Sequence, residues 1–167
     1  IVSYIFPPFP GIGGRRWVKF SKYLHRKGHE VYVVCAENPF GEQSQWTNDA
    51  IIPEDHITRL PFQYPAILSK VPRTVFDKIN YRVQLFLVKR QTKGNYYDRG
   101  IRWKIQLQNT IRNLVAKHGI KNIIVTGAPF HLEYFCSELK TELPGINLVV
   151  DFRDPWTNID FYDKLML

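Results

Sequence analysis

Three loops carry the residues whose types could do chemistry, and each loop follows an apolar run. The first, PPFPGIGGRR at residues 7–16, places Gly13 and Gly14 at the start of a predicted helix. Glycines let backbone N–H groups approach an anion closely, and the helix dipole favours negative charge there. Arg15 and Arg16 add two cations. The loop therefore predicts a phosphate or sugar contact, and the alternative is a tight turn that serves the backbone alone.

The other two loops supply side chains that exchange protons or form ion pairs. His131 begins a predicted helix, where it can donate to a ligand hydroxyl, act as an acid or base, or make a local hydrogen bond. Asp151, Arg153 and Asp154 follow the last apolar run. Two carboxylates that flank an arginine suit hydroxyl recognition or phosphate clamping. We take Arg153 and Asp154 as site candidates and expect Asp151 to be structural, because strand alternation can bury it.

The elements that must position these loops follow from the hydrophobic pattern. Short apolar runs alternate with amphipathic segments, and continuous apolar strands are typical of a parallel sheet covered on both faces. The fold class predicted is α/β, a Rossmann-like parallel sheet with helices on both faces, forming one domain over residues 1–167. The expected strands are 1–6, 30–36, 57–60, 122–126 and 146–152, and the expected helices are 15–27, 101–118 and 131–142. In the helix over 101–118, Ile105 and Ile111 are expected on the same, inward side.

All three loops follow strands, so the fold predicts where they meet. Ligands of open parallel sheets bind beyond the carboxyl ends of the strands, and right-handed crossovers bring successive carboxyl ends to one edge. We therefore expect the three loops to converge there.

A helical insertion is predicted around residues 66–118. Its first part, residues 70–93, mixes lysines and arginines with aromatic and aliphatic residues. A basic helix with an apolar face can lie on an anionic membrane or meet a lipid-linked acceptor, or it can pack on the domain with a solvated basic face. The candidate membrane contacts are Lys78, Arg82, Lys89 and Arg90.

Composition and missing motifs narrow the function classes. The 23 lysines and arginines against 15 aspartates and glutamates give a net charge of +8, which favours anionic partners. Nucleic-acid binding would depend on that charge alone, so no nucleic-acid partner is predicted. Arg16 stands where GxGxxG needs its third glycine, and GKS or GKT is absent. No metal-spaced His/Cys cluster is present, so neither a metal nor a cofactor is expected. Cys35 and Cys136 form no CxxC pair, which favours a reduced, cytoplasmic compartment.

Three ordered segments resemble one known family. SYIFPPFPGIGGRRWVKFSKYLHRKGHEVYVVCAENP, VTGAPFHLEYF and VVDFRDPW are similar to the N-terminal domain of family 4 glycosyltransferases, whereas residues 40–100 are not. The resemblance implies a glycosyltransferase B fold, in which this chain is the acceptor-side half and a donor-binding half follows it. It places Gly13 and Gly14 near the donor phosphates. Many relatives have a cleft-facing histidine where this chain has Arg153.

The same resemblance implies a retaining, metal-independent enzyme whose donor is a nucleotide sugar. Its acceptor would be a surface polysaccharide or a lipid-linked glycan, and the enzyme would be cytoplasmic and peripheral at the inner face of the membrane. Two alternatives stay open. One is a nucleotide-binding Rossmann or flavodoxin-like module in which Glu37 holds a ribose, and the other is a membrane-surface module that uses residues 70–93.

Overall fold

The centre of the molecule is a five-stranded parallel sheet, in a computed structural model that describes residues 1–92 and 98–152. The strand order is β3-β2-β1-β4-β5, and every neighbouring pair is parallel. This order confirms the predicted Rossmann-like class. The strands are β1 (Val2–Ser3), β2 (Val33–Ala36), β3 (Ile57–Leu60), β4 (Asn122–Thr126) and β5 (Asn147–Asp151).

The strand order reverses between β1 and β4. Val2 of β1 pairs with Val34 on one side and with Val125 on the other. The chain therefore leaves β1 toward one half of the sheet and leaves β4 toward the other. Such a topological switch point opens a crevice at the carboxyl ends of the two strands, and ligands of doubly wound sheets bind there.

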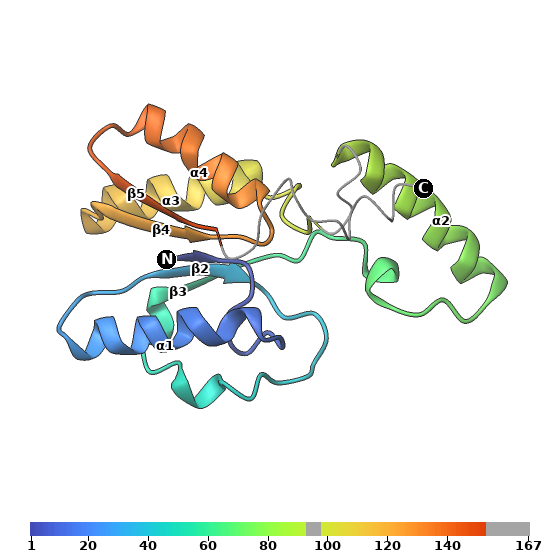
Figure 1. The fold of residues 1–167 in the computed structure, drawn as a ribbon, viewed down its shortest axis with the longest axis horizontal. Helices are drawn as coiled ribbons and strands as arrows, with labels where there is room; N and C mark the ends of the chain where they lie inside the picture. The colour runs from blue at the N-terminus through green and yellow to red at the C-terminus, as the bar shows by residue number, and fades with distance from the viewer. Residues whose placement is uncertain (93–97, 153–167) are drawn as a thin grey trace.

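Helices cover both faces of the sheet, as Figure 1 shows. Helix α1 (Gly13–Arg26) lies on one face, whereas α3 (Lys104–His118) and α4 (His131–Glu142) lie on the other. Each face has its own core. The α1 side is built on Phe6, Val18, Val33, Cys35 and Ile57, and the α3–α4 side on Val2, Trp103, Leu107, Ile111, Val125, Leu132 and Leu139.

Helix α3 begins three residues later than predicted, and one expected core position is wrong. Ile105 was expected beside Ile111 on the inward side, but its side chain is 74% exposed. Six residues at about 100° each place the two isoleucines on different sides of a helix. Leu107 and Gln108 take the inward positions instead. The helix ends at Gly119, whose φ of 63° is the left-handed C-cap conformation that glycine adopts without strain.

Helix α2 (Val75–Gln91) stands apart from the sheet layers in Figure 1. Val88 is its one buried residue. Thr74 caps its first turn, since the Thr74 hydroxyl accepts from Asp77 N–H and the Asp77 carboxylate accepts from Thr74 N–H. The predicted insertion thus has two different parts: residues 66–91 stand apart, whereas α3 packs with α4 as a crossover helix of the sheet. Over residues 1–92 and 98–152, no helix is both long and apolar enough to cross a bilayer.

Candidate functional site

The first and third predicted loops meet through Asp151, the last residue of β5. A single oxygen, Asp151 Oδ2, accepts from Arg16 Nη2, from Trp17 Nε1 at 3.1 Å and from Thr126 Oγ1 at 3.0 Å. These bonds connect the first turn of α1 to the carboxyl ends of β4 and β5. Asp151 therefore has a structural role, as the sequence predicted, and its partner in the ion pair is Arg16.

The glycine-rich loop packs α1 closely on the chain that leaves β1. A Cβ on Gly14 would lie 3.2 Å from the backbone oxygen of Ile5. The amides of Gly14 and Arg15 donate to Gly11 O and Ile12 O. The Gly14 amide, a predicted phosphate donor, is therefore engaged within the turn. Gly13 is half-buried as the first residue of α1.

The two arginines that follow these glycines point to different neighbours. The Arg15 guanidinium lies 4.8 Å from the centroid of the Trp46 ring, within cation–π range. Arg16 pairs with Asp151 instead. The pair of cations predicted for one anion is thus divided between two surfaces of α1.

A buried carboxylate that sequence reasoning missed lies at the start of α4. The side chain of Asp98 is fully buried and accepts from the backbone amides of His131 at 3.0 Å and Gly100 at 3.2 Å. Phe130, at the N-cap position, offers α4 no capping side chain, so Asp98 supplies the negative charge that the helix dipole favours there.

Asp98 also orients the predicted site residue His131. Asp98 Oδ2 lies 2.7 Å from His131 Nδ1, and the His131 side chain is 21% exposed. A carboxylate on one ring nitrogen fixes the position and tautomer of an imidazole. His131 is therefore a held, partly accessible histidine at the carboxyl edge of β4.

Glu133 is a second acidic residue that the sequence did not single out. It is 3% exposed, and a Cβ on Gly127 would lie 2.5 Å from Glu133 Oε1, so the carboxyl lies directly against that backbone. Neither oxygen makes a hydrogen bond of normal distance and angle. Burial raises the pKa of Glu133 to about 7, helped by the carboxylates of Asp151 and Asp98 and opposed by the Gly127 amide.

Tyr4, which follows β1, brings a third buried polar group to this edge. Its ring packs against Trp103 at 4.7 Å, and its hydroxyl has no hydrogen-bond partner among the described residues. Burial raises the pKa of Tyr4 above its usual range, with Asp98 and Arg99 near enough to influence it in opposite directions.

Tyr4, Asp98, His131 and Glu133 together form what we call the switch-point cluster. An unpaired polar group in a protein interior costs about 1–3 kcal/mol, and such groups call for an explanation that is often catalytic. The cluster holds two of them, the Tyr4 hydroxyl and the Glu133 carboxyl. The arrangement can recognise hydroxyl groups and can move a proton near neutral pH.

The remaining predicted site residues do not join this cluster in the described structure. Arg153 and Asp154 lie outside the described residues. The four candidate membrane contacts lie on α2, away from the sheet edge. Within the two described ranges, no group of three or more His, Cys, Asp or Glu side chains could hold a metal ion.

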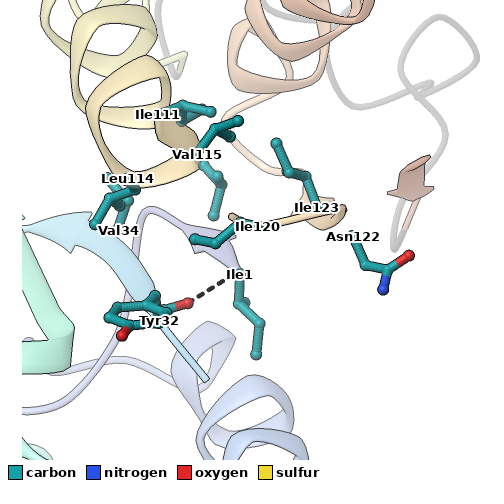
Figure 2. Close-up of a pocket in the computed structure, with 10 residues that line it drawn as sticks. Ile1, Tyr32, Val34, Ile111, Leu114, Val115, Ile120, Asn122 and Ile123 are labelled. Atoms are coloured by element: carbon teal, nitrogen blue, oxygen red, sulfur yellow. Dashed lines mark hydrogen bonds between the residues drawn. The ribbon is translucent and has the colours of Figure 1, made fainter. Parts of the chain in front are cut away.

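One pocket lies at the opposite, amino-terminal edge of the sheet. Figure 2 shows it between α3 and the sheet, where Ile111, Val115 and Ile123 line it and the amino group of Ile1 donates to Tyr32 O at 2.8 Å. Its volume of ≈ 30 Å³ is room for about one water. Small-molecule sites are ten times larger or more. A larger pocket of ≈ 380 Å³ lies at the same edge, lined by His29, Tyr32 and His118, so cavity volume does not select the site. We place the candidate site at the switch point because of the sheet topology and the buried polar groups there.

Comparisons with known proteins leave the family open. No protein-family model, no curated protein and no solved structure matches this chain.

Proposed function

We propose that this chain is the acceptor-side half of a retaining, nucleotide-sugar-dependent glycosyltransferase. The observation that carries the proposal is the switch-point cluster, in which a carboxylate-held histidine lies beside two buried polar groups without hydrogen bonds. Its position at the carboxyl ends of β1 and β4 is where this sheet topology opens its ligand crevice. The loops of residues 7–16 and 126–131 and the end of β5 at Asp151, which belong to the segments that resemble family 4 glycosyltransferases, lie at this edge.

In this proposal the cluster binds the attacking hydroxyl of the acceptor, a glycan or a lipid-linked glycan. His131, held by Asp98, forms a hydrogen bond to that hydroxyl. Glu133, whose pKa is about 7, lies in the same cluster, but it is 3% exposed, so the contact with the acceptor hydroxyl is assigned to His131. Fixing the hydroxyl on the face from which the diphosphate leaves accounts for retention of configuration.

The leaving diphosphate needs positive charge on this side of the crevice. Arg16 is paired with Asp151 and Arg15 lies over Trp46, so we assign that charge first to Arg153 and to the dipole of α1 at Gly13. Asp154 would position Arg153 or a sugar hydroxyl. The nucleotide sugar is the substrate of this scheme, which uses no metal, and the cytoplasm is where such donors are available.

The test separates a catalytic Arg153 from a bracing one. In the full-length protein, Arg153→Ala is expected to lower sugar transfer about 10²-fold or more and to change the melting temperature little, because its charge acts on the transition state. A loss of stability that matches the loss of activity would assign Arg153 to bracing instead.

A nucleotide-binding module remains the second candidate, because Glu37 is exposed at the carboxyl end of β2, where Rossmann proteins hold a ribose. Arg16, at the third glycine position, argues against a dinucleotide. Trp17 lies at this edge, so quenching of tryptophan fluorescence distinguishes the two. The transferase proposal predicts quenching by UDP- or GDP-sugars, and stronger quenching by NAD would favour the module.

A further inference from the structure

Helix α2 exposes a continuous apolar row. Phe76 is 85% exposed, Ile79 56%, Val83 50% and Phe86 64%. These positions are three or four residues apart, so they lie on one side of the helix. Exposed apolar rows of this length mark interaction surfaces in soluble domains. We define the α2 apolar stripe as Val75, Phe76, Ile79, Val83, Phe86 and Leu87, all of them exposed.

Positive charge borders this stripe. Lys78 and Arg82 are exposed along one edge of it, and Arg90 is exposed near its C-terminal end. Asp77 is the one acidic residue of α2, and its carboxylate is engaged by the backbone of Thr74 and Arg73. The stripe and its border therefore attract an anionic partner.

We propose that this face of α2 docks on an anionic membrane surface. A helix in the membrane interface places aromatic and aliphatic side chains among the acyl chains and lysines and arginines at the headgroups. The charged residues of the border, Lys78, Arg82 and Arg90, are all basic, which suits the uniformly anionic headgroups of such a membrane. The stripe lies on the side of the helix opposite the buried Val88. Helix α2 itself stands apart from the sheet layers in Figure 1. The docking does not depend on the transferase proposal, although it would bring a lipid-linked acceptor to that enzyme.

The first measurement is co-sedimentation of the chain with lipid vesicles. Vesicles of phosphatidylcholine mixed with phosphatidylglycerol are expected to bind the chain, and vesicles of phosphatidylcholine alone to bind it far more weakly. High salt should weaken binding to the mixed vesicles, because salt screens the basic border. No binding, or equal binding to both vesicle types, would overturn the proposal.

Variants assign the contribution of each part of the surface. Phe76→Ser with Phe86→Ser should lower vesicle affinity about ten-fold or more for each phenylalanine. Lys78→Gln with Arg82→Gln should lower it about five-fold for each charge. The matched controls are Ile105→Ser, at a residue 74% exposed on α3, and Lys117→Gln with Lys121→Gln, both exposed between the end of α3 and the start of β4. Controls that weaken binding as much as the α2 variants would overturn the assignment to α2.

A positional probe tests whether the stripe enters the lipid. A polarity-sensitive dye can be attached through Val83→Cys or, as a control, Ile105→Cys. Cys35 and Cys136 are buried and burial raises the pKa of each thiol to about 12, so they stay unlabelled. Mixed vesicles should shift the emission of the dye at position 83 to the blue and leave that at 105 unchanged.

Two further measurements distinguish membrane docking from dimer formation and from the transferase proposal. Sedimentation equilibrium tests whether the stripe is instead a contact between two copies of the chain. If the wild type is a dimer that does not bind vesicles, and Phe76→Ser with Phe86→Ser makes it a monomer, the proposal is overturned. His131→Ala should leave vesicle binding intact. A failure of the transferase proposal would thus leave the docking result unaffected.

Discussion

Glu133 is a single residue at the proposed site whose burial lowers the stability of the folded chain when its carboxyl is ionised. Its carboxyl is buried against Gly127 with no hydrogen bond, and its neighbours Asp98 and Asp151 are also acidic. Burial and the two neighbouring carboxylates disfavour the charged form by more than the Gly127 amide favours it, so the pKa rises to about 7. Ionising Glu133 therefore destabilises the folded chain.

Replacing Glu133 with glutamine should remove this pH dependence. Below the ordinary glutamate pKa of 4.5 the carboxyl is neutral in the folded and the unfolded chain, so the residue has no pH-linked effect there. Between pH 4.5 and about 7 the unfolded chain is ionised while the folded chain still holds its proton, so the folded wild type loses stability as pH rises through this window. Glu133→Gln is expected to raise the free energy of unfolding by about 1–3 kcal/mol at pH 8 and to change it little at pH 4. Urea unfolding at both pH values measures this, and the same difference at both would contradict it.

Residue identity alone revealed only part of the site. His131 could be singled out because it follows an apolar strand, which is a local signal. Asp98 could not, because it lies 33 residues before its partner in a segment without a hydrophobic pattern. Glu133 sits among ordinary helical residues, and only the fold places its carboxyl under the Gly127 backbone.

At the scale of elements, Asp151 fastens α1 to two strands. Its Oδ2 atom is the acceptor for the guanidinium of Arg16 and the indole N–H of Trp17, both from α1, and for the hydroxyl of Thr126 in β4. The indole of Trp17 is buried, so if its N–H lost the Asp151 acceptor, water could not replace that hydrogen bond. The hydrogen bonds and the ion pair of Asp151 therefore fix the position of the glycine-rich loop at the switch point.

Asp151→Ala should remove these interactions and lower the stability of the chain. The buried indole N–H and the Thr126 hydroxyl would lose their acceptor, at a cost of about 2–3 kcal/mol in the free energy of unfolding. Asp151→Asn keeps an acceptor oxygen and should cost less. Asp49→Ala is the matched control, since Asp49 forms an ion pair with Lys19 and Lys22 near the surface and its loss should cost the least. Thermal unfolding of the three variants ranks their losses of stability. If Asp49→Ala lost as much stability as Asp151→Ala, the bracing role of Asp151 would be contradicted.

Most elements were predictable because their patterns are local. Continuous apolar runs identified β2, β4 and β5, and helical spacing identified α4 from His131 to Glu142. The environment of α2 was not predictable, because apolar residues occur on more than one side of it. A sequence does not say which side meets the domain, whereas the structure leaves the stripe exposed and buries Val88.

For the whole molecule, strand order determines where the chemistry can be. The order 3-2-1-4-5 puts the switch point between β1 and β4, and the polar groups of the cluster gather at its carboxyl side. The basic face of α2 lies apart from that edge, so catalysis and membrane contact would use separate surfaces of one chain. The predicted convergence of loops is met for residues 7–16, 126–131 and 151, and the rest of the third loop lies beyond the described residues.

The measurement that tests the central claim most directly is sugar transfer by the full-length protein with His131 replaced. His131→Ala is expected to lower the rate of transfer from a UDP- or GDP-sugar about 10²-fold or more, because a held histidine contributes that much to positioning and proton transfer. His29→Ala, at an exposed histidine on the opposite edge of the sheet, should leave the rate unchanged. Wild-type protein that transfers no sugar, or a His131→Ala variant as active as His29→Ala, would contradict the account.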